Sequence, residues 1–158
     1  MDLDIGNDLK DVERAVREFC GKELDQDYLQ KIEGTPRAST WKARLNSYSP
    51  SSGAVQGLSK IKEKFTIISF SAHWCKDCIQ NIPALVKSVK NAGNRNIQLT
   101  MIDMDSNKKL AQEAEVRAIP TIIVYDAGGV EVGRIVENPS KGFVTVEDEL
   151  LSIMTKGS

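Results

Sequence analysis

The stretch Phe70-Ser71-Ala72-His73-Trp74-Cys75-Lys76-Asp77-Cys78 decides how this chain of 158 residues is interpreted. It continues an apolar, β-branched run that starts at Phe65, as expected of a buried strand, and it opens a helical pattern. Two thiols one helical turn apart can form and break a disulfide with each other. The free N–H groups and the dipole at a helix N-terminus favour the thiolate, which is the species that attacks a disulfide. The placement of Cys75 and Cys78 therefore predicts redox chemistry.

Beyond this stretch, helical and strand patterns alternate. We expect a helix from Cys75 to about Ala92 with Pro83 inside it, followed by a strand at Ile97–Met104. A helix at Ser106–Val116, capped by Ser106, comes next. Two strands at Thr121–Asp126 and Glu131–Val136, joined by a glycine hairpin, precede a last helix capped by Thr145. The helix between the first two strands predicts that these strands are parallel. The expected fold class is α/β, with a mixed four-stranded sheet flanked by helices.

The first sixty residues carry helical patterns only. The spacing of apolar residues predicts three helices. The first carries Leu9, Val12, Val16 and Phe19, and the second carries Leu24, Tyr28 and Ile32. The third carries Trp41, Leu45 and Tyr48, which are expected to be packing residues. Cys20 shares a helical face with Val16, which favours a small buried hydrophobe, with a regulatory or resolving role as the alternative. A serine-rich break at 47–53 precedes the change of pattern. We therefore expect an α-helical N-terminal extension at 1–58 and a second domain at 59–158.

Composition limits the classes of partner. The 21 Lys and Arg residues are spread along the chain and nearly balance the 22 Asp and Glu residues, for a net charge of −1, so neither nucleic acid nor a membrane surface is expected as a partner. The start, Met1–Ile5, lacks the features of a signal peptide, and no apolar run is long enough to span a membrane. Cytoplasmic location is the default expectation.

The motif and the order of elements resemble the thioredoxin superfamily over roughly residues 60–155. Trp74 precedes the first cysteine as in that family, Pro83 stands five residues after the second, and Ile119-Pro120-Thr121 is similar to the family's Ile-Pro-Thr, whose proline is cis. The resemblance implies a thioredoxin-like fold. It implies that Cys75 is the exposed attacking nucleophile and that Cys78 is the shielded thiol that resolves the mixed disulfide.

The resemblance also implies roles for neighbouring residues. Ile119 and Pro120 bind substrate, because a cis bond leaves the N–H and C=O of Ile119 free to pair with an extended strand. Trp74 either packs beneath the motif or presents a flat surface to substrates. Three residues modulate the site. Lys76 favours the thiolate of Cys75 and Asp77 opposes it, whereas His73 stabilises the thiolate when protonated or lies in solvent.

Several positions depart from the family pattern. The buried Asp of thioredoxins is replaced by Ser69, and its Lys partner on the next strand by Met101. This double replacement is self-consistent, because either charge left alone in the interior would be costly. No carboxylate is then evident in the family's place as the proton acceptor of Cys78, which leaves water or the neighbouring Asp77 for this role. Ser71 replaces a second Trp, and a groove-lining glycine is replaced near Glu137.

We predict a thiol–disulfide oxidoreductase that serves cell redox homeostasis. Its redox group is the Cys75–Cys78 disulfide, with no other cofactor and no metal, and its partners are disulfide-containing proteins and a thiol or flavoenzyme reductant. A protein-binding module with vestigial redox activity is one alternative, and metal or iron–sulfur binding through the two thiols is another. An exported chain would instead oxidise or isomerise disulfides. The extension is expected to cover the edge of the sheet, with a dimer interface or a gate as alternatives.

Overall fold

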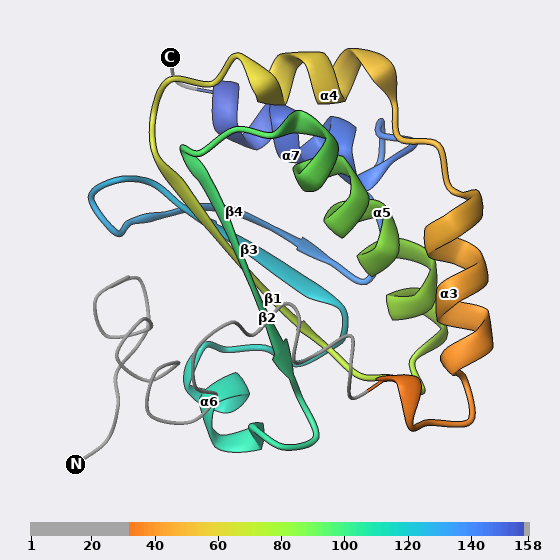
Figure 1. Cartoon of the computed structure of the whole chain (residues 1–158). Coiled ribbons are helices and arrows are strands. Elements are labelled where there is room, and N and C mark those ends of the chain that lie inside the picture. Colours follow the sequence, from red (N-terminus) through yellow and green to blue (C-terminus); the bar gives the residue numbers. More distant parts are fainter. Residues whose placement is uncertain (1–31, 157–158) are drawn as a thin grey trace.

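The central sheet has four strands in the order β2-β1-β3-β4. The computed structural model describes residues 32–156 (Figure 1). The elements follow in the order α3 (Ala38–Ser47), α4 (Ser52–Ser59), β1 (Phe65–Ser71), α5 (Lys76–Ala92), β2 (Ile97–Asp103), α6 (Lys108–Glu113), β3 (Thr121–Tyr125), β4 (Glu131–Val136) and α7 (Val146–Thr155). The strands β1 and β2 are parallel, whereas β1–β3 and β3–β4 are antiparallel. The predicted mixed four-stranded α/β fold is thereby confirmed.

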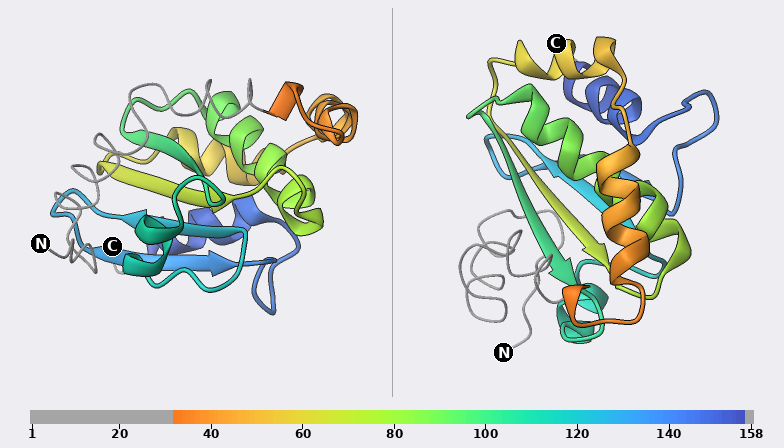
Figure 2. Two further views of the ribbon diagram at one scale, coloured as in Figure 1. Left: turned by 90° about the horizontal axis from the view of Figure 1, so that it is seen from below. Right: turned by 45° about the vertical axis from the view of Figure 1, so that its right-hand side comes forward.

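Both faces of the sheet are covered, which explains why its central strands are apolar at nearly every position. Ile67 and Ile122 belong to the core shared with α3, α4, α5 and α7. Their neighbours Ile68 and Ile123 point to the opposite face, in the core built with α6. Two views show α6 on the other side of the sheet from α5 (Figure 2). The site described below lies where β1 passes into α5.

The two described helices of the extension lie on the helix layer. Helix α3 packs against α5, and α4 packs against both α5 and α7 (Figures 1 and 2). The expectation that the extension covers the sheet edge is therefore wrong for these two helices, because their apolar residues Trp41 and Leu58 join the core beneath α5 instead. The helix predicted around Leu9–Phe19 and the interpretation of Cys20 lie outside the described residues.

A buried carboxylate joins the extension to α7. Glu147 is fully buried, and its Oε2 accepts hydrogen bonds from the hydroxyl of Tyr48 at 2.6 Å and from the backbone N–H of Ser51 at 2.9 Å. Burial, followed by the hydrogen bond to Glu147, raises the pKa of Tyr48 above its usual range. The sequence pattern predicts only a packing role for Tyr48, so this polar contact is an addition.

Several local predictions need correction and others hold. Helix α6 begins at Lys108 rather than near Ser106, whose hydroxyl donates to Asp103 Oδ2 at 2.6 Å and caps nothing. Thr145 does cap α7, since its Oγ1 accepts from the N–H of Asp148 at 3.1 Å. No helix in the described part of the chain combines the length and apolar character that a membrane crossing requires.

Candidate active site

The two cysteines meet at the start of α5. Cys75 is the N-cap residue, and its Sγ accepts a hydrogen bond from the backbone N–H of Cys78 at 3.2 Å. A side chain in this position satisfies one of the free N–H groups of the first turn. The sulfur of Cys75 therefore lies at the helix end where negative charge is stabilised. Both thiols are free, as in the reduced form of a cysteine pair.

Cys78 is the inner thiol and is completely buried. Burial raises its pKa well above the usual range, and a hydrogen bond between its side chain and Cys75 raises it further. The backbone of Ala72 works in the opposite direction, and the nearby charge of Asp77 adds to the rise. The site thus pairs a sulfur at a helix end with a protonated thiol behind it.

Cys75 is less accessible than the resemblance implied. Only 7% of the residue is exposed, so the expectation of an exposed nucleophile is wrong in this conformation. Its side chain turns inward over the first turn of α5, and its Sγ lies 3.6 Å from the carbonyl oxygen of Ile119, which accepts from the thiol. The loop before β3 therefore covers one side of the sulfur.

That loop places Ile119 and Pro120 beside the cysteines. The peptide bond between these two residues is cis. Thr121 Oγ1 donates to the carbonyl of Ala118 at 2.6 Å, which holds the turn. The Ile119 carbonyl already accepts from Cys75, and the Ile119 N–H donates to no acceptor among residues 32–156. Within the described part of the chain, the backbone N–H of Ile119 is thus left without an acceptor, as an incoming strand would require.

Trp74 forms the exposed border of the site. Half of its surface is exposed, and its indole N–H donates to Asp105 Oδ2 at 2.8 Å. Of the two roles left open for it, presenting a flat surface fits this exposure better than packing beneath the motif. A groove of about 760 Å³ begins at Trp74 and Ile119 and continues between α6 and the segment before Pro120.

The three predicted modulators lie close to the cysteines in different ways. Lys76 is exposed and Asp77 is half-buried, both in the first turn of α5. Asp77 acts on Cys78, as described above, and is the only carboxylate among the causes of its shift. His73 is half-buried, and its Nδ1 is buried without a hydrogen-bond partner among the described residues.

Helix α3 makes two contacts with the segment around the cysteines that the sequence does not predict. Trp41 on α3 is nearly fully buried, and its indole N–H donates to the carbonyl oxygen of His73 at 2.8 Å. The extension therefore holds the loop that leads into Cys75. Arg44, one turn further along α3, donates to the carbonyl of Gln80 on α5 at 3.1 Å. No local pattern signals either contact, because the partners are more than thirty residues apart.

Two of the predicted departures from the family pattern, Ser69 and Met101, face each other in the structure. Ser69 on β1 lies directly opposite Met101 on β2, and both are buried. The hydroxyl oxygen of Ser69 has no hydrogen-bond partner among the described residues. Glu137 has φ of 67°, a left-handed conformation that suits glycine, and its N–H donates to the carbonyl of Pro120 at 2.7 Å.

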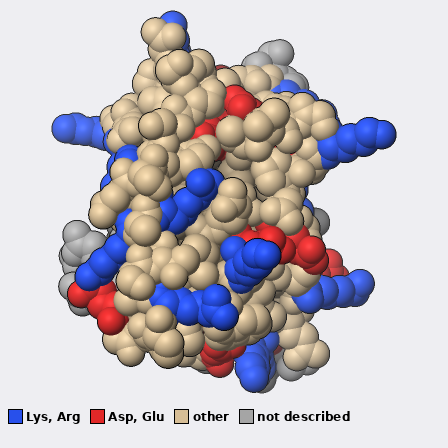
Figure 3. All heavy atoms as spheres, turned by 90° about the vertical axis from the view of Figure 1, so that its right-hand side faces the viewer, with Lys and Arg blue, Asp and Glu red and all other residues tan. Residues whose placement is uncertain are grey.

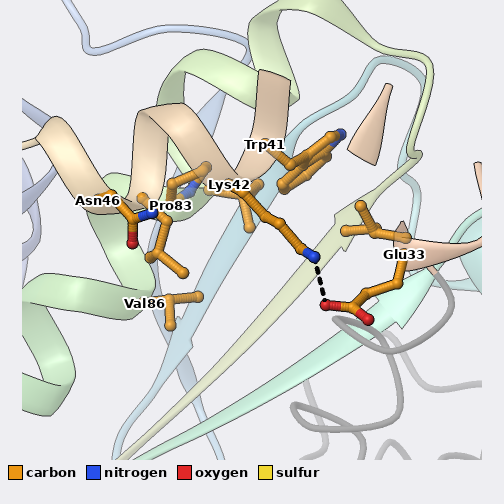
Figure 4. A pocket seen from close by; sticks show the side chains of 9 residues that line it. Glu33, Trp41, Lys42, Asn46, Pro83 and Val86 are labelled. Atoms are coloured by element: carbon orange, nitrogen blue, oxygen red, sulfur yellow. Dashed lines mark ion pairs between the residues drawn. The ribbon is translucent and has the colours of Figure 1, made fainter. Parts of the chain in front are cut away.

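A second, apolar groove of about 340 Å³ runs between α3 and α5 (Figure 4). It is lined by Trp41 and Pro83, among others, and the ion pair of Lys42 with Glu33 at 2.9 Å crosses it. On the face of the molecule where α3 lies, Lys and Arg side chains are separated by uncharged atoms and form no single basic patch (Figure 3). Neither feature brings a further reactive side chain to the cysteines.

The donor set around the thiols bears on the metal alternative. Structural zinc needs four ligands in one place. Within residues 32–156, no three side chains of His, Cys, Asp or Glu are grouped so that they would hold a metal ion. The pair of thiols therefore has no further donors from the described part of its own chain.

Comparison with known proteins gives a consistent family. A family model described as thioredoxin matches residues 23–149. A thioredoxin from Coprinus comatus is 37% identical over 65 residues, which are 41% of this chain and 61% of that protein. Thioredoxin-2 from Saccharomyces cerevisiae is 34% identical over 79 residues, which are 49% of this chain and 73% of that protein. The chain thus spans less than two thirds of the length of the Coprinus protein.

A solved structure matches almost the whole chain. The crystal structure of an HIV epitope scaffold covers 99% of this chain and 96% of its own, with a TM-score of 0.57 and 20% sequence identity. At that identity the likeness concerns the fold alone.

Proposed function

Because the chain belongs to the thioredoxin family, we propose that it is a thiol–disulfide oxidoreductase that reduces disulfides of partner proteins. The observation that carries this proposal is the paired placement of the two cysteines. Cys75 Sγ caps α5 and accepts from the N–H of Cys78, whose own thiol is buried one turn behind it. The pair itself is the redox group, so the reaction needs no bound cofactor.

The reaction consists of two exchanges. The Cys75 thiolate attacks one sulfur of the partner disulfide, so a Cys75–partner bond forms, the partner disulfide breaks, and the leaving sulfur takes up a proton. Cys78 then loses its proton and attacks Cys75 Sγ, which releases the second partner thiol and leaves a Cys75–Cys78 disulfide. The partner gains two electrons and two protons, and a thiol or flavoenzyme reductant restores the protein. This direction fits the reducing cytoplasm.

The second step has an unusual requirement in this chain. The pKa of Cys78 is raised by burial, and the position where thioredoxins carry a buried Asp is occupied by Ser69. The proton of Cys78 must therefore leave to Asp77 or to water as the bond forms. We expect resolution of the mixed disulfide, rather than the first attack, to accelerate most as pH rises.

Insulin reduction by dithiothreitol tests the proposal. The protein should accelerate it, the Cys75→Ser variant should not, and Cys78→Ser should accumulate a mixed disulfide that mass spectrometry detects. Cys20→Ser is the matched control for loss of a thiol and should behave as the unaltered chain. Absence of acceleration by the unaltered protein would exclude the proposal.

The second candidate function is a protein-binding module with vestigial redox activity. The neutral pair Ser69 and Met101 favours it, because it removes the family's internal proton acceptor. The two candidates differ in turnover. A module would bind partners equally well after Cys75→Ser and would show no multiple turnover with a reductant.

A further inference from the structure

A tight turn leads from β1 to the first cysteine. The backbone N–H of Cys75 donates to the carbonyl of Ala72 at 3.2 Å, so His73 and Trp74 are the central residues of a four-residue turn. The peptide between these two residues has no partner within such a turn. It can point in either of two directions, which distinguish a type I from a type II turn. Its direction therefore depends on a contact from outside the turn.

Trp41 on α3 supplies that contact. Its indole N–H donates to the His73 carbonyl at 2.8 Å, and only 3% of the residue is exposed. The ring belongs to the same core as both cysteines. A side chain packed in a core keeps one rotamer and one position, so its donor fixes the direction of the carbonyl that it binds. The turn peptide is therefore held by the extension.

Helix α3 is in turn fastened to α5, the helix that begins at the site. Lys87 on α5 donates through Nζ to the carbonyls of Leu45 and Asn46 at 2.8 and 3.3 Å, near the C-terminal end of α3. A lysine is a favourable donor for the last carbonyls of a helix. Trp41 lies in the first turn of α3. The two helices thus form one frame, and the indole is the point where this frame holds the turn.

The position of the Cys75 sulfur depends on the same turn, because a single residue separates Cys75 from His73. From a backbone with φ of −79° and ψ of 120°, Cys75 Sγ reaches the N–H of Cys78 at 3.2 Å. A turn of the other type would direct the chain into Cys75 along a different path. The bound indole N–H therefore helps to keep the sulfur over the first turn of α5.

We propose that Trp41 is a positioning residue of the redox site, whose hydrogen bond to the His73 carbonyl holds Cys75 Sγ in place for attack on a disulfide. The inference rests on the proposed function and assigns part of the site to the extension. An indole buried in the core meets no substrate and acts only through the turn. Without its N–H the turn adopts both directions, the sulfur leaves the end of α5 for part of the time, and the attack slows.

The first exchange can be measured alone. In a chain with Cys20→Ser and Cys78→Ser, Cys75 is the only thiol left. It attacks dithiobis(nitrobenzoate), forms a mixed disulfide with one half and releases the other half as a coloured thiolate. Trp41→Phe should lower the second-order rate constant about fivefold, as the loss of one hydrogen bond allows. Benzothienylalanine at position 41 replaces the indole N–H by sulfur and keeps the shape of the ring, so it should give the same loss without a cavity.

Hydrogen exchange of the backbone N–H of residue 78 is a readout that a purely structural role would not move. This N–H is bonded to Cys75 Sγ, so its protection should fall about fivefold in both Trp41 variants, as the rate does. The matched control is Lys87→Met, which removes two hydrogen bonds between α5 and α3 and leaves the His73 carbonyl bonded. It should lower the free energy of unfolding and change neither the rate constant nor the exchange.

Failure of the inference differs from failure of the proposed function. If the unaltered protein does not accelerate insulin reduction, the proposed function fails. If it does, and benzothienylalanine at position 41 changes neither readout, the function stands and the inference is wrong. Equal losses in Lys87→Met and in the Trp41 variants would likewise overturn it, because a general loosening of α3 would explain them. If the Trp41→Phe chain does not fold, the analogue of the same shape decides.

Discussion

Ser69 on β1 and Met101 on β2 are buried and face each other on adjacent parallel strands. Neither side chain of this pair carries a charge. Cys78 is buried in the same core, and its raised pKa reflects burial rather than a nearby buried charge. At the scale of single residues, the pKa of the inner thiol is therefore raised mainly by burial, with Asp77 adding a smaller rise. A charge introduced at either position would change both stability and reactivity.

Ser69→Asp is expected to destabilise the reduced protein by about 3 kcal/mol, because it buries an unpaired carboxylate. Met101→Lys should cost a similar amount for the same reason. The double variant should cost at least about 1 kcal/mol less than the sum, since the two charges would face each other. Urea unfolding under reducing conditions measures all three free energies.

Ser69→Ala is the control for this cycle. It removes a buried hydroxyl that has no partner among the described residues, so its effect should be near zero or stabilising. Strict additivity of the two charged substitutions would show that the side chains at these positions do not meet, and would contradict the pairing of Ser69 with Met101 in the register of β1 and β2.

At the scale of elements, one buried carboxylate on α7, that of Glu147, accepts two hydrogen bonds from the extension. Tyr48→Phe removes the shorter of the two hydrogen bonds to Glu147 Oε2 and leaves Ser51 as the remaining donor. We expect a loss of about 1 to 3 kcal/mol in the free energy of unfolding, because a buried acceptor loses a partner.

The same exchange at Tyr125 is the matched control. Tyr125 is fully buried on β3, and its hydroxyl has no hydrogen-bond partner among the described residues. Tyr125→Phe should therefore change stability by less than about 0.5 kcal/mol or increase it. Chemical denaturation measures both variants. Equal losses at the two positions would mean that the ring, and not the bond to Glu147, matters at Tyr48.

The elements from β1 to α7 were predictable because each carries a clear period and a recognisable start or stop. Thr145 before α7 and the apolar run of β1 are examples. Helix α4 was missed, since its serine and glycine residues are typical of a break. Gly57 faces Leu151 of α7 so closely that a Cβ would come within 2.5 Å of it. Small residues there serve close helix packing, which a local pattern does not reveal.

The candidate site was predictable to a different degree. The spacing of the cysteines and the position of Pro120 identify the reacting atoms from local sequence. The burial of Cys75 under Ile119 and the bond from Trp41 to His73 were not predictable, because each joins residues more than thirty positions apart. Such contacts depend on how whole elements dock.

At the scale of the whole molecule, three weakly acidic groups with raised pKa values predict lower stability in alkali. Burial raises the pKa of Tyr125 from 10.0 to about 12, and it also raises those of Tyr48 and Cys78. A raised pKa means that the unfolded chain releases the proton first. The stabilising contribution is complete below the unfolded pKa and is lost as pH rises through the folded one.

For Tyr125 this window runs from about pH 10 to about pH 12. The free energy of unfolding of the reduced protein, measured by urea denaturation, should fall across it. The Tyr125→Phe variant should lose less over the same range, because it has no proton to release at this position. Parallel curves for the two proteins would show that Tyr125 already ionises as a solvent-exposed tyrosine does.

The bond between Trp41 and the His73 carbonyl has a practical side for protein engineers. Anyone who transplants this dithiol loop into another scaffold, taking the segment from β1 onward as a self-sufficient cassette, leaves its anchoring indole behind. Such a segment would contain both cysteines, but the His73 carbonyl would lose its hydrogen bond from Trp41 and α5 would lose its packing against α3. A faithful graft has to bring α3 along.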